Sequence, residues 1–415
     1  MPAGRFSDGR LIIDFLAKSL GHPFLSAYLD SLGTNFSYGA NFATAASTIR
    51  LPDQNFPAGG FSPLQLKSRS QLLRHRDTGG FAASLSPPTP PYGETYFHMP
   101  VGRFSDGRLI IDFLAKSLGH PFLSAYLDSL GSNFSYGANF ATAASTIRLP
   151  DQIFPAGGFS PFYLNIQYVQ FMQLKSRSQL IRHRGGIFAS LMPKEEYFSK
   201  ALYTFDIGQN DLGEGFSGNL TVQEVNASVP DIISGFSANI KKIYDLGARS
   251  FWIHNTGPIG CLPYIFANFP AQKDEAGCAK SYNEVAQHFN QKLKEATVQL
   301  RKDLPLAAIT YVDVYSVKYS LFKESQKYGF ELPLVACCGY GGKYNYNSSS
   351  ECGGTARVNG RQIFVGSCKD PSVRVNWDGI HYTEAAAKFI SDKISTGAFS
   401  DPPLALKQAC HKNLA

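Results

Sequence analysis

The chain has 415 residues, of which 44% are hydrophobic and 17% charged, and its formal net charge is +7. This is the composition of a globular protein with enough apolar side chains for a full core, and the thinly spread charge argues against nucleic-acid binding. No apolar stretch approaches the roughly 20 residues of a membrane span, so we expect no transmembrane segment. The chain opens MPAGRFSDGR without an apolar run, so we expect no signal peptide there.

The first part of the chain is a near-copy of a later part. Residues 1–63 recur at 99–161, and the later copy then contains an additional FYLNIQYVQFM before both resume QLKSRSQ. The offset of 98 residues is far longer than the roughly 20–50 residues of solenoid repeats. We therefore interpret residues 1–76 as a truncated duplicate of residues 99–184, too short to bury both faces of a sheet and expected to pack poorly. Residues 77–415 form the main domain in this interpretation.

Hydrophobic patterning after the Pro-rich stretch LSPPTPPYG predicts alternating helices and strands. Ser105 or Asp106 is expected to cap a helix with apolar residues on one face, which stops at Gly119. Later strand segments lack polar alternation, as buried parallel strands do. In chain order the expected elements are strand 201–207, helix 229–246, strand 250–254, helix 281–302, strand 308–312 and a last helix starting at Thr383. This order predicts an open α/β sheet with helices on both faces and sites at the carboxyl ends of its strands.

All cysteines lie in the last part of the chain, and their spacing does not match paired zinc ligands. They are Cys261, Cys278, Cys337, Cys338, Cys352, Cys368 and Cys410. Disulfides with one cysteine left over are the favoured interpretation, and they imply an oxidising compartment. Asn-X-Ser/Thr sequons, including those at 133, 219, 226 and 347, fit a secreted glycoprotein. No residue cluster suggests a metal or an organic cofactor.

Two stretches near predicted strand or helix ends contain candidate catalytic side chains. Asp378-Gly379-Ile380-His381 places a carboxylate three residues before a histidine, so that Asp378 can hold imidazole Nδ1 and leave Nε2 as a general base. The alternative is an aspartate that caps the helix and a histidine that satisfies it. Asn210 follows a buried strand and can donate to an oxyanion. The alternative there is a simple turn, since Gly, Asn and Asp are the usual turn residues.

A third stretch, residues 137–145 (GANFATAAS), is rich in small residues. Small side chains allow backbone N–H groups to approach a substrate, and they equally suit a tightly packed turn.

Five blocks together resemble one family. GRFSDGRLIIDF, GANFATAAS, FDIGQNDL, NTGPIGCLP and VNWDGIHYTEAA occur in the order found in plant GDSL esterase/lipases of the SGNH-hydrolase superfamily, closest to the early-nodulin and fucosidase-like branch. The resemblance covers essentially residues 77 to about 400. It implies a flavodoxin-like three-layer α/β/α fold with a mostly parallel sheet. It also implies secretion and hydrolysis of acetyl or lipid-like carboxylic esters by a serine nucleophile.

The resemblance also assigns roles to individual residues. His381 resembles the general base, Asp378 its orienting partner and Asn210 an oxyanion donor. In many relatives a glycine of the GANFATAAS loop donates its backbone N–H to the oxyanion. Here Ala143 and Ala144 occupy that neighbourhood, and the N–H of Ala144 can take the role.

The nucleophile of the family is missing from its expected place. The family block reads approximately G-D-S-N-S-D-T-G-G, and only its end matches here, at residues 77–80. The GDS triplet would fall at Leu72, Leu73 and Arg74, within LKSRSQLLRHR, which matches LKSRSQLIRHR at 174–184. The first strand and the serine are therefore replaced.

Other serines do not fill the gap in the sequence. Ser7 and Ser105, both in FSDG, are better interpreted as helix N-caps than as nucleophiles. Loss of the nucleophile cost on the order of 10⁶-fold in a well-studied serine protease, so we expect little esterase activity. Two further interpretations stay open: a catalytically dead protein that binds acyl chains or carbohydrate, and a fused gene model of two tandem esterase genes.

Overall fold

The computed structural model describes residues 11–21, 23, 26–27, 40–41, 88–128, 132–151 and 158–409. The expected nucleophile position, Arg74, lies outside these ranges, as do Ser7 and Cys410. None of the helices in the described ranges combines the length and the hydropathy of a membrane span.

The centre of the molecule is a four-stranded sheet in the order β10-β7-β6-β5. Its strands are β5 (Leu202–Phe205), β6 (Ser250–His254), β7 (Ala308–Val312) and β10 (Ser400–Asp401). The first three are parallel, and Phe251 of β6 lies opposite Tyr203 and Ile309 in the ladder. The predicted strands are confirmed, β5 being shorter than expected, and so is the α/β class. The short β10 is antiparallel to β7 and was not predicted.

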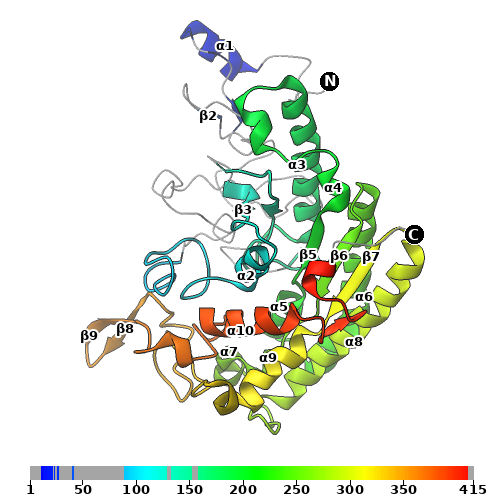
Figure 1. Cartoon of the computed structure of the whole chain (residues 1–415). Coiled ribbons are helices and arrows are strands. Elements are labelled where there is room, and N and C mark those ends of the chain that lie inside the picture. Colours follow the sequence, from blue (N-terminus) through cyan, green and yellow to red (C-terminus); the bar gives the residue numbers. More distant parts are fainter. Residues whose placement is uncertain are drawn as a thin grey trace.

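Helices pack against both faces of this sheet because successive strand residues point to opposite sides. Phe251 and Ile253 of β6 share one core cluster with the helices α6 (Val222–Asp245) and α8 (Lys280–Asp303). Trp252, between them, belongs to a second cluster with α2 (Ile110–Ser117), α9 (Val314–Lys323) and α10 (Glu384–Ile394). Figure 1 shows α8 and α10 on either side of the strands.

Two helix starts differ from the prediction. Helix α6 begins seven residues before the predicted 229, because Thr221 and Glu224 form a capping box there. The predicted caps of α2 are wrong: Leu109 precedes that helix, and its N–H donates to the Asp112 carboxylate at 2.8 Å.

Ser105 and Asp106 cap nothing on α2 and instead hold the start of α10. Ser105 Oγ donates to the carbonyl of Tyr382 at 3.1 Å. Asp106 Oδ1 accepts the N–H of Glu384 at 2.7 Å, at the first residue of α10. The segment before α2 therefore anchors the turn that leads into α10.

Several elements went unpredicted because their sequences are polar or very short. The longest is α3 (Leu164–Arg184), which carries Lys, Arg, Gln and Ser around its circumference. Short unpredicted elements are α4 (Tyr197–Lys200), α5 (Gln209–Ser217), α7 (Pro263–Asn268), the parallel pair β3 (Ser124–Ala125) and β4 (Ala138–Asn139), and the antiparallel hairpin β8 (Thr355–Val358) and β9 (Arg361–Phe364). Helix α9, of ten residues, was not predicted either.

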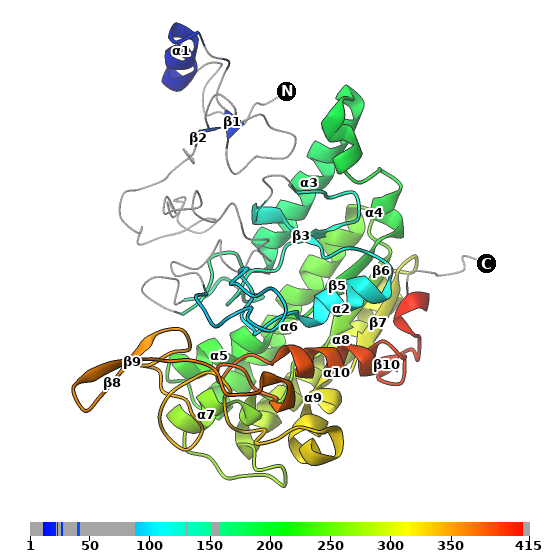
Figure 2. The ribbon, with the colours of Figure 1, turned by 60° about the vertical axis from the view of Figure 1, so that its left-hand side comes forward.

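The duplicated sequence forms the same helix twice, in different surroundings. Helix α1 (Ile12–Ser19) and α2 both read IIDFLAKS, and the first copy also forms the short parallel pair β1 (Ser26–Ala27) and β2 (Ala40–Asn41). Phe15 of α1 is 56% exposed, whereas its counterpart Phe113 of α2 is 8% exposed. Figure 2 shows α1 apart from the main body of the protein.

The six cysteines in the described ranges form three disulfides, which confirms the disulfide prediction. The pairs are Cys261–Cys278, Cys337–Cys368 and Cys338–Cys352. The adjacent Cys337 and Cys338 thus form disulfides with cysteines of two different segments. Both of these disulfides lie in a cluster with Tyr92 and Trp377, next to the turn at 378–381.

Candidate functional site

The turn before α10 brings Asp378 and His381 into direct contact. Asp378 Oδ2 lies 2.7 Å from Nδ1 of His381. The side-chain oxygen of Asn376 accepts the N–H of Gly379 at 2.7 Å, and Gly379 has φ +99, a left-handed conformation that favours glycine. The backbone of this turn is therefore held in the shape that aims the carboxylate at the imidazole.

All the acceptor positions of the buried Asp378 carboxylate are used. Oδ1 accepts the N–H groups of Ile380 and His381, at 3.0 and 2.8 Å, and Oδ2 accepts the Tyr92 hydroxyl at 2.8 Å besides the imidazole. Burial alone would raise the pKa of this carboxyl. The His381 imidazole and the two backbone N–H groups outweigh burial, so the pKa of Asp378 lies below its ordinary value.

A carboxylate can only accept hydrogen bonds, so Nδ1 of His381 carries the proton of the 2.7 Å contact. The side chain of His381 is 40% exposed, and its ring lies 5.3 Å from that of Phe104. Among the described residues no side chain hydrogen-bonds Nε2 of His381. This nitrogen is available as a proton acceptor.

A second aspartate–histidine pair lies nearby but lacks this free nitrogen. His254 Nδ1 lies 3.2 Å from Asp206 Oδ2, while Nε2 accepts the indole N–H of Trp252 at 3.0 Å. Burial acts to raise the pKa of Asp206, but the Lys318 ammonium and His254 lower it below its ordinary value. With both ring nitrogens engaged, His254 cannot accept a further proton without losing a contact.

The two predicted oxyanion donors lie in neighbouring segments. Asn210, in the first turn of α5, donates through Nδ2 to the carbonyl of Ser145 at 2.9 Å, which ties it to the 137–145 loop. Ala144 in that loop has φ +59, an unusual conformation for a residue with a Cβ. The carbonyl of Ala144 accepts the N–H of Ser160 at 2.9 Å. The structure thus holds this loop beside the carboxyl end of β5.

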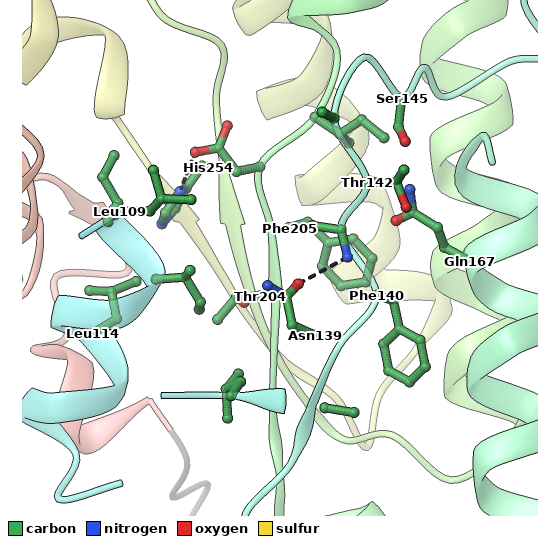
Figure 3. Close-up of a pocket in the computed structure, with 18 of the residues that line it drawn as sticks. Leu109, Leu114, Asn139, Phe140, Thr142, Ser145, Gln167, Thr204, Phe205 and His254 are labelled. Carbon is green, nitrogen blue, oxygen red and sulfur yellow. Dashed lines mark hydrogen bonds and ion pairs between the residues drawn. The ribbon is translucent and has the colours of Figure 1, made fainter. Parts of the chain in front are cut away.

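Ala144, Ser145 and Asn210 line one large cavity of about 1980 Å³, together with Asp378 and His381. Figure 3 shows labelled side chains around it from α2 and the residue before it (Leu114 and Leu109), from the 137–145 loop (Asn139 and Phe140) and from β5 (Thr204 and Phe205). Most of the lining is apolar, and Asp206, Asn210 and His254 are polar lining residues at or just beyond the carboxyl ends of β5 and β6. An apolar cavity with a few polar groups is typical of a ligand site.

The described serines that line the cavity are engaged elsewhere. Ser145 Oγ donates to the carbonyl of Phe162 at 2.9 Å, Ser135 Oγ to Asn133, Ser190 Oγ to the carbonyl of Ile187, and Ser217 Oγ lies 3.0 Å from the Tyr264 hydroxyl. None of these contacts involves His381. In the described part of the chain, no group of three or more His, Cys, Asp or Glu residues is arranged to hold a metal ion.

The sequence reasoning missed the residues that hold the pair from outside the turn. Tyr92 and Phe104 lie almost 300 positions before His381, and no local pattern connects them to it.

Comparisons with known proteins find relatives over most of this chain. The family model described as GDSL-like Lipase/Acylhydrolase matches residues 77–394. An esterase of Hevea brasiliensis is 68% identical over 339 residues, which cover 81% of this chain and 86% of the relative. The GDSL esterase/lipase ENOD8 of Medicago truncatula is 61% identical, covering 81% and 87%. Alpha-L-fucosidase 3 of Arabidopsis thaliana is 54% identical, covering 77% and 87%.

Proposed function

The chain belongs to the GDSL-like lipase/acylhydrolase family, and its relatives include proteins named esterases. From that premise we propose that it retains the acid–base half of the catalytic site of an ester hydrolase without its nucleophile. The observation that supports this most strongly is the 2.7 Å contact between Asp378 and His381 at the wall of the apolar cavity. His381 is the general base and Asp378 its orienting partner in this proposal.

The geometry explains what this pair does when a hydroxyl is present. Asp378 keeps the proton on Nδ1, so Nε2 takes the proton of an attacking hydroxyl and later returns it to the leaving alcohol. A carboxylate next to the charged imidazolium stabilises it during the reaction. Asn210 and the N–H of Ala144 are the oxyanion donors in the proposal, because both belong to segments that meet at the cavity.

The missing serine argues that this chain itself is impaired. The position expected for the nucleophile carries Arg74, whose guanidinium stays protonated and cannot attack a carbonyl carbon. The described serines of the cavity donate to other groups. We therefore assign the chain a retained ester-binding and acid–base site with little hydrolysis.

Finer features of the protein belong to the same proposal. The packing of α6 and α8 on one face and of α9 and α10 on the other supports the flavodoxin-like three-layer arrangement. The exposed α1 supports the interpretation of residues 1–76 as a truncated duplicate and of residues 77–415 as the hydrolase domain. Three disulfides and the sequons support secretion and glycosylation.

The test is a gain of function in the same chain. Residues 66–76 are replaced by a five-residue apolar strand followed by Gly-Asp-Ser-Asn-Ser, and hydrolysis of p-nitrophenyl acetate and butyrate is followed. We expect a rise of at least about 10³-fold over the parent chain and a loss of about 10²–10⁴-fold when His381→Ala is added. Hydrolysis by the parent chain that His381→Ala abolishes would refute the claim of impairment. A restored activity that survives His381→Ala would refute the assignment of the base.

A further inference from the structure

Helix α1 exposes apolar side chains that its copy α2 buries. Residues 4–20 and 102–118 have the same sequence, GRFSDGRLIIDFLAKSL, so every residue of α1 has an identical counterpart in α2. Leu16 is 53% exposed, whereas its counterpart Leu114 is 2% exposed. Ile12 is 81% exposed, and its counterpart packs against the same core cluster as Leu114. The chain itself therefore shows which surroundings fit the exposed face of α1.

The place that α2 occupies is built by parts of the chain outside both copies. Leu114 shares a core cluster with Ile390 of α10. Just before the helix, Arg108 forms an ion pair with Glu384 of α10 at 2.6 Å, and its guanidinium lies 4.1 Å from the centre of the Tyr96 ring. We call Tyr96 and α10 the α2 seat. Neither belongs to the duplicated sequence, so the chain holds two copies of the helix and one seat.

The side chains of the two copies give the seat no means of distinguishing them. The positions at which the copies differ, which are 3, 34 and 55 in the first copy, all lie outside residues 4–20. Only the connection differs, because α2 follows Tyr96 closely in sequence while a much longer piece of chain joins α1 to Tyr96. A longer tether lowers the effective concentration of the segment that it carries. Helix α2 therefore holds the seat, and α1 is the weaker competitor.

We propose that the α2 seat binds either helix, so that α1 docks on α10 of its own chain when α2 leaves. Burial of the exposed leucine and isoleucine side chains of α1 favours this docking. The tether favours the seat of the same chain over that of a second molecule. A linked segment has an effective concentration of up to about 1 mM, whereas a second molecule is present at micromolar concentration in an assay.

A docked α1 rebuilds one wall of the cavity. Ile110, Leu114 and Ala115 of α2 line the cavity, together with Leu109 before the helix. Because α1 carries the same residues in the same order, the exchange changes no side-chain type in this wall. The proposal concerns the way in which the chain closes its cavity, and it does not rest on the proposed ester hydrolysis.

The test uses the two equivalent leucines in the full chain. Leu114→Glu puts a charge into a buried position and is expected to drive α2 from the seat. Leu16→Glu changes an exposed position of the parent chain and should lower its melting temperature by less than about 1 °C. In the Leu114→Glu background it should lower the melting temperature by at least about 4 °C, because α1 then holds the seat. Distant positions that do not compete have additive effects, so an equal shift in both backgrounds overturns the proposal.

A milder pair keeps the test decisive where the glutamate variant does not fold. Leu114→Ala and Leu16→Ala, alone and combined, leave a small cavity in place of a buried charge. The same melting temperature for Leu114→Ala with and without Leu16→Ala overturns the proposal. Lys18→Gln is the control on α1, because its counterpart Lys116 is exposed in α2. A loss from Lys18→Gln as large as that from Leu16→Glu, in the Leu114→Glu background, contradicts docking through the apolar face.

The reactivity of a thiol at position 16 reports docking directly. Leu16→Cys should react with a maleimide at least about tenfold more slowly in the Leu114→Glu background than in the parent chain, because the thiol then takes the buried place of Leu114. Mass spectrometry distinguishes the two helix peptides in this double variant. Equal rates overturn the proposal. Protection that rises with protein concentration and accompanies a dimer in size-exclusion chromatography identifies the seat of a second molecule, which also overturns docking within one chain.

Discussion

Replacing Asp378 by asparagine tests the orienting role of this residue without changing its size. Oδ1 accepts two backbone N–H groups, so the amide oxygen must take that position, and the NH2 group then takes the place of Oδ2. There it faces Nδ1 of His381 and the Tyr92 hydroxyl, which both donated to the carboxylate. The imidazole must now accept at Nδ1, and its proton moves to Nε2. The proposed base thereby loses its acceptor.

The expected loss of stability follows from these contacts. The contacts of Oδ2 with His381 Nδ1 and with the Tyr92 hydroxyl are hydrogen bonds to a charged acceptor, and each contributes about 1.5–3 kcal/mol. In the variant both become hydrogen bonds between neutral groups, and each contributes about 0.5–1.5 kcal/mol. We expect Asp378→Asn to lower the free energy of unfolding by about 2–3 kcal/mol at pH 7. The folded pKa of Asp378 is lowered, so its contribution is present above the unfolded value of about 4 and is lost as the pH falls through the folded pKa. The difference in the free energy of unfolding between the parent chain and Asp378→Asn should therefore shrink below about pH 4.

Two measurements check this prediction. Imidazole ¹⁵N chemical shifts report which ring nitrogen carries the proton, and urea denaturation at several pH values reports the free energy of unfolding. Asp392→Asn is the control, because the side chain of Asp392 is 60% exposed in an i,i+4 ion pair with Lys388. A variant that keeps the proton on Nδ1, or that unfolds with unchanged free energy at pH 7, would refute the reasoning.

Three further predictions follow from individual contacts. Tyr92→Phe removes one donor to Asp378 and should lower the free energy of unfolding, measured by urea denaturation, by about 1.5–3 kcal/mol. Tyr96→Phe, at an exposed position, should lower it little, and equal effects of the two changes would contradict the role of the Tyr92 hydroxyl. Ala144→Gly relieves the strain of a left-handed backbone at φ +59 and should raise the melting temperature. Ala143→Gly changes a neighbouring residue without a positive φ and should lower the melting temperature. A lower melting temperature for Ala144→Gly than for Ala143→Gly would argue against strain at Ala144. Burial raises the pKa of Asp211 to about 7, so this group makes the protein lose stability as the pH rises from about 4 to 7, at up to about 1.4 kcal/mol per pH unit. Asp211→Asn should flatten this pH dependence in thermal melts while Asp231→Asn, with a 74% exposed side chain, should not.

The sequence predicted the inner strands of the sheet well because their signal is local. Ser250–His254 and Ala308–Val312 are short apolar runs bounded by polar or turn residues, and both strands have the predicted limits. The start of α6 was misplaced: the capping box at Thr221 begins the helix at Val222, and the helix continues through Pro230. Helix α3 was missed because its polar residues are spread around its circumference.

The site was predictable only as far as its residues are close in sequence. Asp378 and His381 share one turn, so their spacing allowed the contact, and the resemblance to the family favoured it over the helix-cap alternative. Tyr92 meets Asp378 across 286 positions, and Asp106 caps α10 rather than the adjacent helix. Such long-range contacts depend on the folded arrangement of the two segments and leave no periodic pattern. The size of the cavity along β5 follows from the same long-range packing.

Labelling with a fluorophosphonate tests the central claim most directly, because this reagent bonds covalently to a serine that an adjacent base activates. The full chain and His381→Ala are treated in parallel with a serine esterase that has an intact triad, and labelled peptides are identified by mass spectrometry. We predict that the esterase is labelled and that no serine of this chain is labelled above the level of His381→Ala. A serine that is labelled in the chain and spared in His381→Ala would show that the base still has a nucleophile, and would contradict the account.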